Sequence, residues 1–370
     1  MLFYYNREYK YNEQRVFFMT EIKEVSKKRL ENVKNLTTIP SPTGYTADII
    51  HYICGLFDEM GVTYEVTPKG GLLVSIDGKN KESHRFVTAH VDTLGGMVRA
   101  IKPNGRLKLD LIGGFTFNAI EGEYCTVHSS LEDKEYNGTI LMHQTSVHVY
   151  KDARTAERNQ DNMEIRLDYK VKHQEDVEEL GIQVGDFISF DPRATITDEG
   201  FIKSRHLDDK VSVALLIELV ENIHRNQFDL AHTTHFYIST NEEIGYGGNS
   251  NIASEVKEYL AVDMGAMGDD QRTDEYSVSI CAKDGSGPYH LGLRNQFVQL
   301  CKANDIPYQL DIYPFYSSDA SAAMRAGADV RHGLIGAGID SSHAYERTHY
   351  ESVDATYELI ERYLESEMID

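Results

Sequence analysis

Helical and strand-like segments alternate along most of this 370-residue chain, but the alternation stops between residues 92 and 203. Before this stretch, apolar spacing predicts helices near residues 21–36 and 46–60, followed by strands such as R-F-V-T-A-H. After it come a helix from Asp208, the strands H-F-Y-I-S-T and E-Y-L-A-V-D, and a last helix near residues 355–367. Such alternation predicts a layered α/β domain.

The interrupting stretch has a different pattern. Short β-rich pieces, among them G-T-I-L-M, S-V-H-V-Y and F-I-S-F, are separated by Gly, Asp and Asn turns. Regular short strands with turn signals are typical of a small barrel or sandwich. We therefore expect a β-rich domain over residues 93–203, inserted into a catalytic α/β domain formed by residues 19–92 and 204–370.

The N-terminal residues and the cysteines indicate where the protein works. Residues 1–18 lack the apolar stretch and the cleavage site of a signal peptide, and Met19 opens a more ordinary beginning. We expect residues 1–18 to be a disordered or mis-started extension. No run approaches the roughly eighteen apolar residues of a membrane helix. The four cysteines are widely spaced, which argues against a disulfide scaffold and a structural zinc site and favours the cytoplasm.

The chain is strongly acidic, with a formal net charge of −22. Such a charge repels phosphate backbones, so we expect no nucleic-acid partner. It attracts cations, which include metal ions and the free amino end of a peptide. An acidic surface also simply keeps a protein in solution, so charge alone does not choose between these roles.

Five acidic or imidazole side chains each stand at a strand end or a helix start. They are His90 in T-A-H-V-D, Asp208 in R-H-L-D-D-K, Glu243 in S-T-N-E-E-I-G, Asp263 in A-V-D-M-G and His343 in S-S-H-A-Y-E-R. Ligands of open α/β sheets bind beyond the carboxyl ends of strands. A mixed N/O ligand set without cysteine suits zinc, cobalt or manganese in an open catalytic site. The five residues therefore predict a site for two divalent metal ions.

Two neighbouring acids could assist these ligands. Asp92 lies two residues after His90 on the same strand face, so it could orient the imidazole ring. Glu242 stands beside Glu243 and could take a proton from a bound water. The plainer alternatives are solvated acids on loops and, for Asp208, an ordinary helix N-cap. His349 competes with His343 as the last ligand.

In this order, the segments resemble the glutamyl (deblocking) aminopeptidase family of co-catalytic metallopeptidases, whose members build tetrahedral dodecamers. T-T-I-P-S-P-T-G-Y-T is similar to the family's I-P-G-x-S-G-x-E segment, and T-A-H-V-D-T-L-G-G-M-V to its A-H-x-D-x-x-G-x-x-V. R-H-L-D-D-K matches its D-D-R helix start, S-T-N-E-E-I-G-Y-G-G its Q-E-E-x-G-x-x-G, and A-V-D-M-G its A-x-D-x-x. The likeness spans residues 28–364.

The resemblance implies a three-layer α/β/α zinc-exopeptidase fold in which the inserted β-barrel is a PDZ-like dimerisation domain. It also implies a role for each candidate residue. The metal ligands are His90, Asp208 as the bridge, Glu243, Asp263 and His343, with Glu242 as the general base and Asp92 orienting His90.

The last motif departs from the family pattern. The family's R-Y-x-H-S-P-x-E is replaced by D-S-S-H-A-Y-E-R-T-H. Counting from S-S-D-A, whose Asp319 resembles the family's T-D-A, favours His343 and places Glu346 near the family's glutamate. His349 remains the alternative, and the departure marks a divergent branch.

The function that this resemblance implies is a two-metal-dependent aminopeptidase that removes N-terminal residues from short peptides through a metal-bound water activated by Glu242. Zinc is the expected metal, with cobalt or manganese as alternatives, and the expected assembly is a homo-oligomer between a dimer and a dodecamer. One competing function is an amidohydrolase, deacylase or carboxypeptidase-like enzyme, which would need a basic pocket for a substrate carboxylate. Another is a non-catalytic metal-binding scaffold, against which the presence of both Glu242 and Glu243 counts.

Overall fold

The computed structural model describes residues 22–369, so the expected extension at residues 1–18 lies outside the described residues. A ten-stranded sheet forms the larger part, in the order β1-β2-β12-β3-β13-β18-β15-β16, with β14 paired to β18 and β17 to β15. The predicted mixed α/β architecture is confirmed. Its strands are β1 (Glu65–Val66), β2 (Leu72–Ile76), β3 (Asn80–His90), β12 (His232–Ser239), β13 (Val256–Val262), β14 (Gly265–Ala266), β15 (Val278–Asp284), β16 (Gly287–Pro288), β17 (Tyr308–Ile312) and β18 (Arg331–Ile339).

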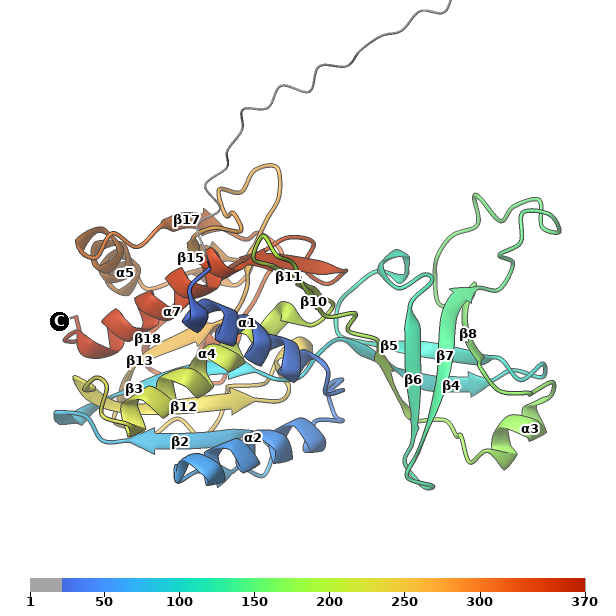
Figure 1. Cartoon of the computed structure of the whole chain (residues 1–370), viewed down its shortest axis with the longest axis horizontal. Coiled ribbons are helices and arrows are strands. Elements are labelled where there is room, and N and C mark those ends of the chain that lie inside the picture. The colour runs from blue at the N-terminus through green and yellow to red at the C-terminus, as the bar shows by residue number, and fades with distance from the viewer. Residues whose placement is uncertain (1–21, 370) are drawn as a thin grey trace, which may run out of the picture.

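The helices cover the two faces of this sheet unequally (Figure 1). One face buries a continuous aliphatic core under five helices. These are α1 (Glu24–Thr37), α2 (Ala47–Met60), α4 (Leu207–His224), α5 (Leu291–Ala303) and α7 (Tyr350–Glu365). The opposite face carries the seven-residue α6 (Asp319–Arg325), whose Ala320 and Ala323 lie in a largely aromatic core with Phe86, Tyr237 and Tyr259.

Helix α7 begins five residues before the predicted start at residue 355. The His349 side chain accepts a hydrogen bond from the backbone N–H of Glu351 and so caps the first turn. A cap of this kind satisfies an N–H group that has no partner within the helix. The predicted helix began at residue 355 and so left out this first turn, in which Val353 is buried.

Six short strands form a closed barrel beside the α/β part (Figure 1). Alternate residues of these strands point inward and form a separate apolar core that includes Leu109, Val127, Ile140, Ile165 and Ile188. In barrel order the strands are β4 (Gly95–Ile101), β5 (Leu107–Ile112), β8 (Met163–Leu167), β7 (Lys134–Met142), β6 (Tyr124–Ser129) and β9 (Phe187–Phe190).

One piece of this region differs from the prediction. S-V-H-V-Y, expected as a strand, forms a turn in which Val149 and Tyr150 both donate backbone hydrogen bonds to the carbonyl of Ser146. Val147 and Val149 are exposed, so neither has a buried face to pack against. Between β8 and β9 the chain also forms the short helix α3 (Gln174–Glu179), which the turn-rich pattern did not predict.

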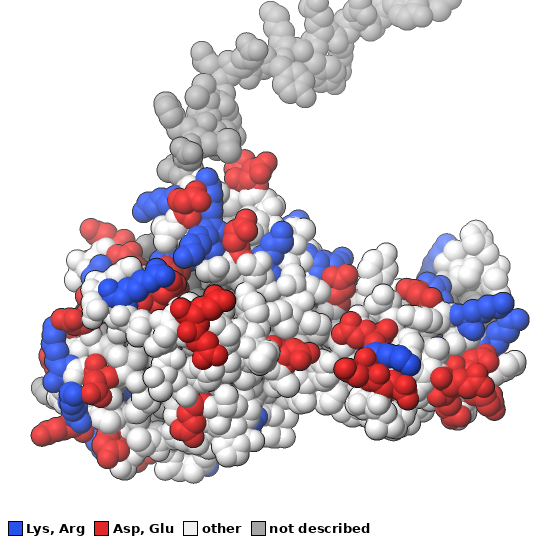
Figure 2. All heavy atoms as spheres, turned by 60° about the horizontal axis from the view of Figure 1, so that its bottom comes forward, with Lys and Arg blue, Asp and Glu red and all other residues white. Residues whose placement is uncertain are grey.

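After the barrel, the chain returns to the α/β part through β10 (Thr195–Ile196) and β11 (Phe201–Ser204), and β11 pairs with β19 (Glu346–His349). Among residues 22–369, no helix is long and apolar enough to cross a membrane. Acidic and basic side chains are interspersed on the face drawn in Figure 2, and acidic groups gather on the barrel.

Candidate metal centre

The four central strands β12, β3, β13 and β18 run parallel, so their carboxyl ends lie along one edge of the sheet. His90 is the last residue of β3, and Asp263 directly follows β13. Glu242 and Glu243 lie in a single 3₁₀ turn three residues after β12, and His343 lies in the loop after β18. Strand direction thus collects residues that are up to 253 positions apart in the sequence (343 − 90).

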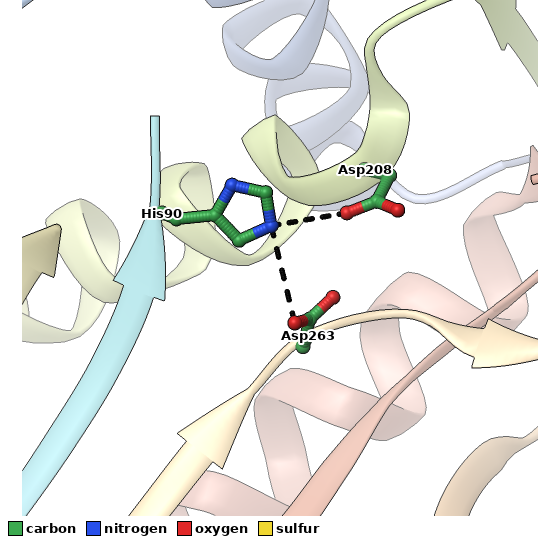
Figure 3. Close-up of side chains that lie close together, drawn as sticks. All are labelled: His90, Asp208 and Asp263. Carbon is green, nitrogen blue, oxygen red and sulfur yellow. Dashed lines mark hydrogen bonds and ion pairs between the residues drawn. The ribbon is translucent and has the colours of Figure 1, made fainter. Parts of the chain in front are cut away.

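The first group of side chains consists of His90, Asp208 and Asp263 (Figure 3). The Nε2 atom of His90 lies 3.1 Å from Oδ1 of Asp208 and 3.9 Å from Oδ2 of Asp263. All three side chains are buried. Their potential ligand atoms lie within 4.8 Å of one another, which is close enough to surround one ion.

A second group, formed by Asp208, Glu243 and His343, shares Asp208 with the first. The Nε2 atom of His343 lies 3.3 Å from Oδ2 of Asp208 and 3.6 Å from Oε2 of Glu243. The two oxygens of Asp208 therefore face different histidines. The peptide bond between Asp208 and Asp209 is cis, and both residues depart from helical geometry at the start of α4.

Asp92 supports this centre differently from the expectation. Its carboxylate accepts hydrogen bonds from the backbone N–H groups of Glu242 and Glu243, at 3.1 and 3.2 Å, and from the Thr43 hydroxyl at 2.7 Å. The ring Nδ1 of His90 lies 2.9 Å from the backbone carbonyl of Asp92, but 3.5 Å from the carboxylate. Asp92 thus holds His90 mainly through its main chain and holds the Glu242–Glu243 turn through its side chain.

Glu346 fixes the loop that carries His343. One carboxylate oxygen accepts the N–H of Asp208 and the other accepts the N–H of His343, both at 3.1 Å. His343 has a φ of 63° and Ser341 a φ of 58°, a region that side-chain-bearing residues rarely adopt. The buried Glu346 thus stabilises an unusual backbone path that carries the imidazole to Asp208.

His349, the competing histidine, lies elsewhere. It ends β19, and its Nε2 atom lies 2.9 Å from the carbonyl of Glu199. Its ring packs against Phe201 and Tyr276. It belongs to neither group of potential ligands.

Three further residues support the site, and two of them, Thr43 and Tyr316, were not singled out from the sequence. Thr43 belongs to the P-S-P-T-G segment, and the buried Lys210 of R-H-L-D-D-K donates to the carbonyl of Ile39 just before that segment. Tyr316 has a buried hydroxyl that interacts with the carboxylate of Asp263. Thr43 lies in a recognised motif, which is a usable signal, whereas no pattern marked Tyr316.

Crowding of acids changes the protonation of the centre. Burial, with the charge of Asp208, raises the pKa of Asp263 to about 7. Burial also raises the pKa of Glu243 to about 8 and that of Glu242 well above its usual value. Burial opposes protonation of His343, but its hydrogen bond with Asp208 and the charge of Glu243 raise its pKa to about 11. Buried carboxylates this close together repel one another unless protons or cations lie between them.

The donor set fits divalent metal ions. Two imidazoles and three carboxylates offer both nitrogen and oxygen, and no cysteine takes part. This chemistry suits zinc, cobalt or manganese. The carboxylates alone would suit harder ions, but the two histidines favour borderline metals.

An α/β sheet that gathers histidines and acids at the carboxyl ends of its parallel strands defines the class of protein as a metallohydrolase. The sequence comparison gives the family. The chain belongs to the M42 glutamyl aminopeptidase family, whose model matches residues 70–359. The predicted resemblance is thereby confirmed, and the protein is a peptide hydrolase of the aminopeptidase class.

Individual relatives support this assignment. The Bacillus subtilis protein named "Putative aminopeptidase YhfE" is 61% identical over 93% of this chain and 99% of its own. A TET aminopeptidase from a marine-sediment thaumarchaeote has a TM-score of 0.84 at 17% identity, covering 92% of this chain and 97% of that one. The Pyrococcus horikoshii TET1 peptidase, which assembles into a tetrahedron or an octahedral shell, has a TM-score of 0.79 at 22% identity, covering 91% and 99%. These two structures share the fold.

Proposed function

We propose that the protein is a two-metal aminopeptidase that removes N-terminal residues from short peptides. The observation that carries this proposal is the sharing of Asp208 between two groups of potential ligands. His90 and Asp263 would complete one ion site, and Glu243 and His343 the other. When bound, the two ions would polarise the scissile carbonyl and lower the pKa of a water molecule.

Glu242 is the proposed general base. Its Oε2 lies 3.8 Å from His90 Nε2, and it belongs to neither ligand group. No hydrogen bond from a described residue reaches its carboxylate, whereas its backbone N–H is held by Asp92. A carboxylate held by its backbone and otherwise free can accept a proton from an attacking water and pass it to the leaving amine.

The barrel is the proposed dimerisation domain, with residues 93–203 as the insertion and a PDZ-like character. It has its own apolar core, so it can present a surface without disturbing the catalytic sheet. Structural relatives that build a tetrahedron or an octahedral shell support a homo-oligomer here as well. Light scattering on the full chain should give a multiple of the monomer mass, and a strictly monomeric active enzyme would contradict this part of the proposal.

Hydrolysis of aminoacyl-p-nitroanilides tests the proposed activity directly. We expect turnover with added zinc, cobalt or manganese and loss of turnover with a chelator, because the ions supply the Lewis acidity. Intact N-termini in a peptide mixture, together with no anilide turnover under any metal, would contradict the proposal.

Replacing each of the two competing histidines separates their roles. His343→Ala should lower the amount of bound metal from two ions to one and reduce kcat/KM by about 10²-fold or more, because a ligand is lost. His349→Ala removes a helix cap, so it should cost about 1 kcal/mol of stability while two ions stay bound. Metal analysis after dialysis measures the first effect, and thermal unfolding measures the second. The reverse pattern would show that His349 is the metal ligand and His343 is not.

Metal binding should release protons at pH 7. Glu243, with a pKa of about 8, and His343, with a pKa of about 11, are both protonated in the metal-free protein at this pH. Ligand atoms must lose their protons to bind, so affinity should fall as pH falls from 8 to 6, about tenfold per pH unit for each proton displaced. Calorimetry in two buffers of different ionisation enthalpy counts the protons, and a count of zero would contradict the ligand assignment.

A further inference from the structure

A cavity of about 490 Å³ opens beside the proposed metal centre. Its wall includes His343 and also Met264, the residue that follows Asp263. Volumes of about 300–1,000 Å³ are typical of pockets that bind small molecules. The cavity is therefore placed to receive a group that is attached close to the bond being cleaved.

Aromatic rings form one side of this cavity. Tyr313, Phe315 and Tyr316 come from the segment between β17 and α6, and the Phe315 side chain is fully exposed. Such rings give apolar contact to an alkyl chain and attract a cation over their faces. This wall therefore suits a long side chain that ends in a positive charge.

Two carboxylates form another part of the wall. Asp269 and Asp270 lie in the loop after β14, both exposed, and neither makes an ion pair with a residue of the described range 22–369. The residues that line the cavity include no lysine or arginine. Apart from His343, which lies at the metal centre, the wall carries no cationic side chain, so a cationic ligand would find two carboxylates without ion-pair partners.

Tyr316 connects this cavity with the proposed metal centre. It lines the cavity, and its buried hydroxyl interacts with the carboxylate of Asp263. A side chain held in the cavity would therefore lie next to the acid cluster.

We propose that this cavity binds the side chain of the substrate's N-terminal residue and selects lysine or arginine. The inference rests on the proposed aminopeptidase function and adds the substrate class to it. The alkyl part of the side chain lies against Tyr313 and Phe315, and its charged end faces Asp269 and Asp270. Long cationic side chains commonly bury their stems and keep the charge near the solvent in this way. The preference is opposite to the acidic one in the family's description.

The test compares kcat/KM for lysyl, arginyl, leucyl and glutamyl p-nitroanilides, using the full-length, metal-loaded protein. Lysyl and arginyl substrates should exceed the glutamyl substrate by about 10²-fold. The double variant Asp269→Asn with Asp270→Asn should lower the lysyl-to-leucyl ratio about tenfold, because two exposed charges each contribute a few-fold. A matched double variant, Asp229→Asn with Asp329→Asn, removes two exposed aspartates that precede the amino ends of β12 and β18 and should keep the ratio.

Ionic strength gives a second measurement that does not depend on folding. Raising NaCl from about 0.05 to 0.5 M should lower the lysyl-to-leucyl ratio of the unaltered protein but change it little in the Asp269/Asp270 double variant. A glutamyl preference, or an unchanged ratio in that variant, would overturn this inference and leave the aminopeptidase function standing. Absence of turnover for every anilide with every metal would overturn the proposed function, and this inference with it.

Discussion

The variant Glu242→Gln should lose turnover by about 10²–10⁴-fold while binding two metal ions per chain. Glutamine has nearly the same shape, but its amide cannot accept a proton from the attacking water. Glu242 belongs to neither ligand group, and Asp92 holds it only through its backbone N–H, so the metal centre should stay in place. Steady-state kinetics on a leucyl or lysyl anilide and metal analysis on the same sample provide the measurement.

Glu243→Gln is the matched control for this variant. Glu243 adjoins Glu242 in the same turn, and its backbone N–H is held by the same Asp92 carboxylate. Its side chain, however, lies beside His343 in the second ligand group. We expect this control to lose bound metal, so the two neighbours should give opposite metal results. Metal loss in Glu242→Gln with retention in Glu243→Gln would show that the base and the ligand are exchanged.

The variant Asp208→Asn should weaken both ion sites at once. One oxygen of Asp208 faces His90 and the other faces His343, so this side chain alone belongs to both groups. Loss of a supporting partner already costs about 10–100-fold in metal affinity, and a shared ligand should cost at least that at each site. We expect fewer than one ion per chain after dialysis and no measurable turnover.

His343→Ala provides the comparison for this result because it affects one ion site only. If Asp208 bridges, Asp208→Asn must lose more metal than His343→Ala. Equal losses from the two variants would contradict the bridge and leave Asp208 as a ligand of a single ion. Circular dichroism should show that both variants remain folded, since each substitution reduces charge or size in an acid-crowded site.

Local sequence patterns were sufficient to predict where much of this candidate site lies on the fold. His90, Asp263 and the Glu242–Glu243 pair each follow an apolar strand run, and parallel strands end at the same edge of their sheet. The same reasoning separated the barrel from the sheet, because its short strands and turns interrupt the helix–strand alternation. Local pattern failed at S-V-H-V-Y, which forms a turn. Its two valines are exposed, but the sequence alone does not distinguish this segment from the β-rich segments that do form strands.

Local sequence patterns did not predict the contacts between distant segments of the chain. The carboxylate of Asp92 accepts a hydrogen bond from the backbone of Glu242 at 3.1 Å and lies farther, at 3.5 Å, from the ring of His90. Tyr316 reaches the site from the segment between β17 and α6, and no periodicity of the sequence marks it.

The sequence by itself determined the fold class and the strand-end or helix-start positions of the candidate ligands, because both follow from local periodicity, and the resemblance of its motifs indicated the family. Only the tertiary structure decided how these residues meet. His343 and His349 stand six positions apart (349 − 343), yet the first lies beside Asp208 and the second on β19 against Phe201. The left-handed backbone of the loop and the Glu346 carboxylate, which binds the N–H groups of both Asp208 and His343, set this difference. The hydrogen bond between Asp208 and Glu346 joins segments 138 residues apart, so no local pattern of the sequence encodes it.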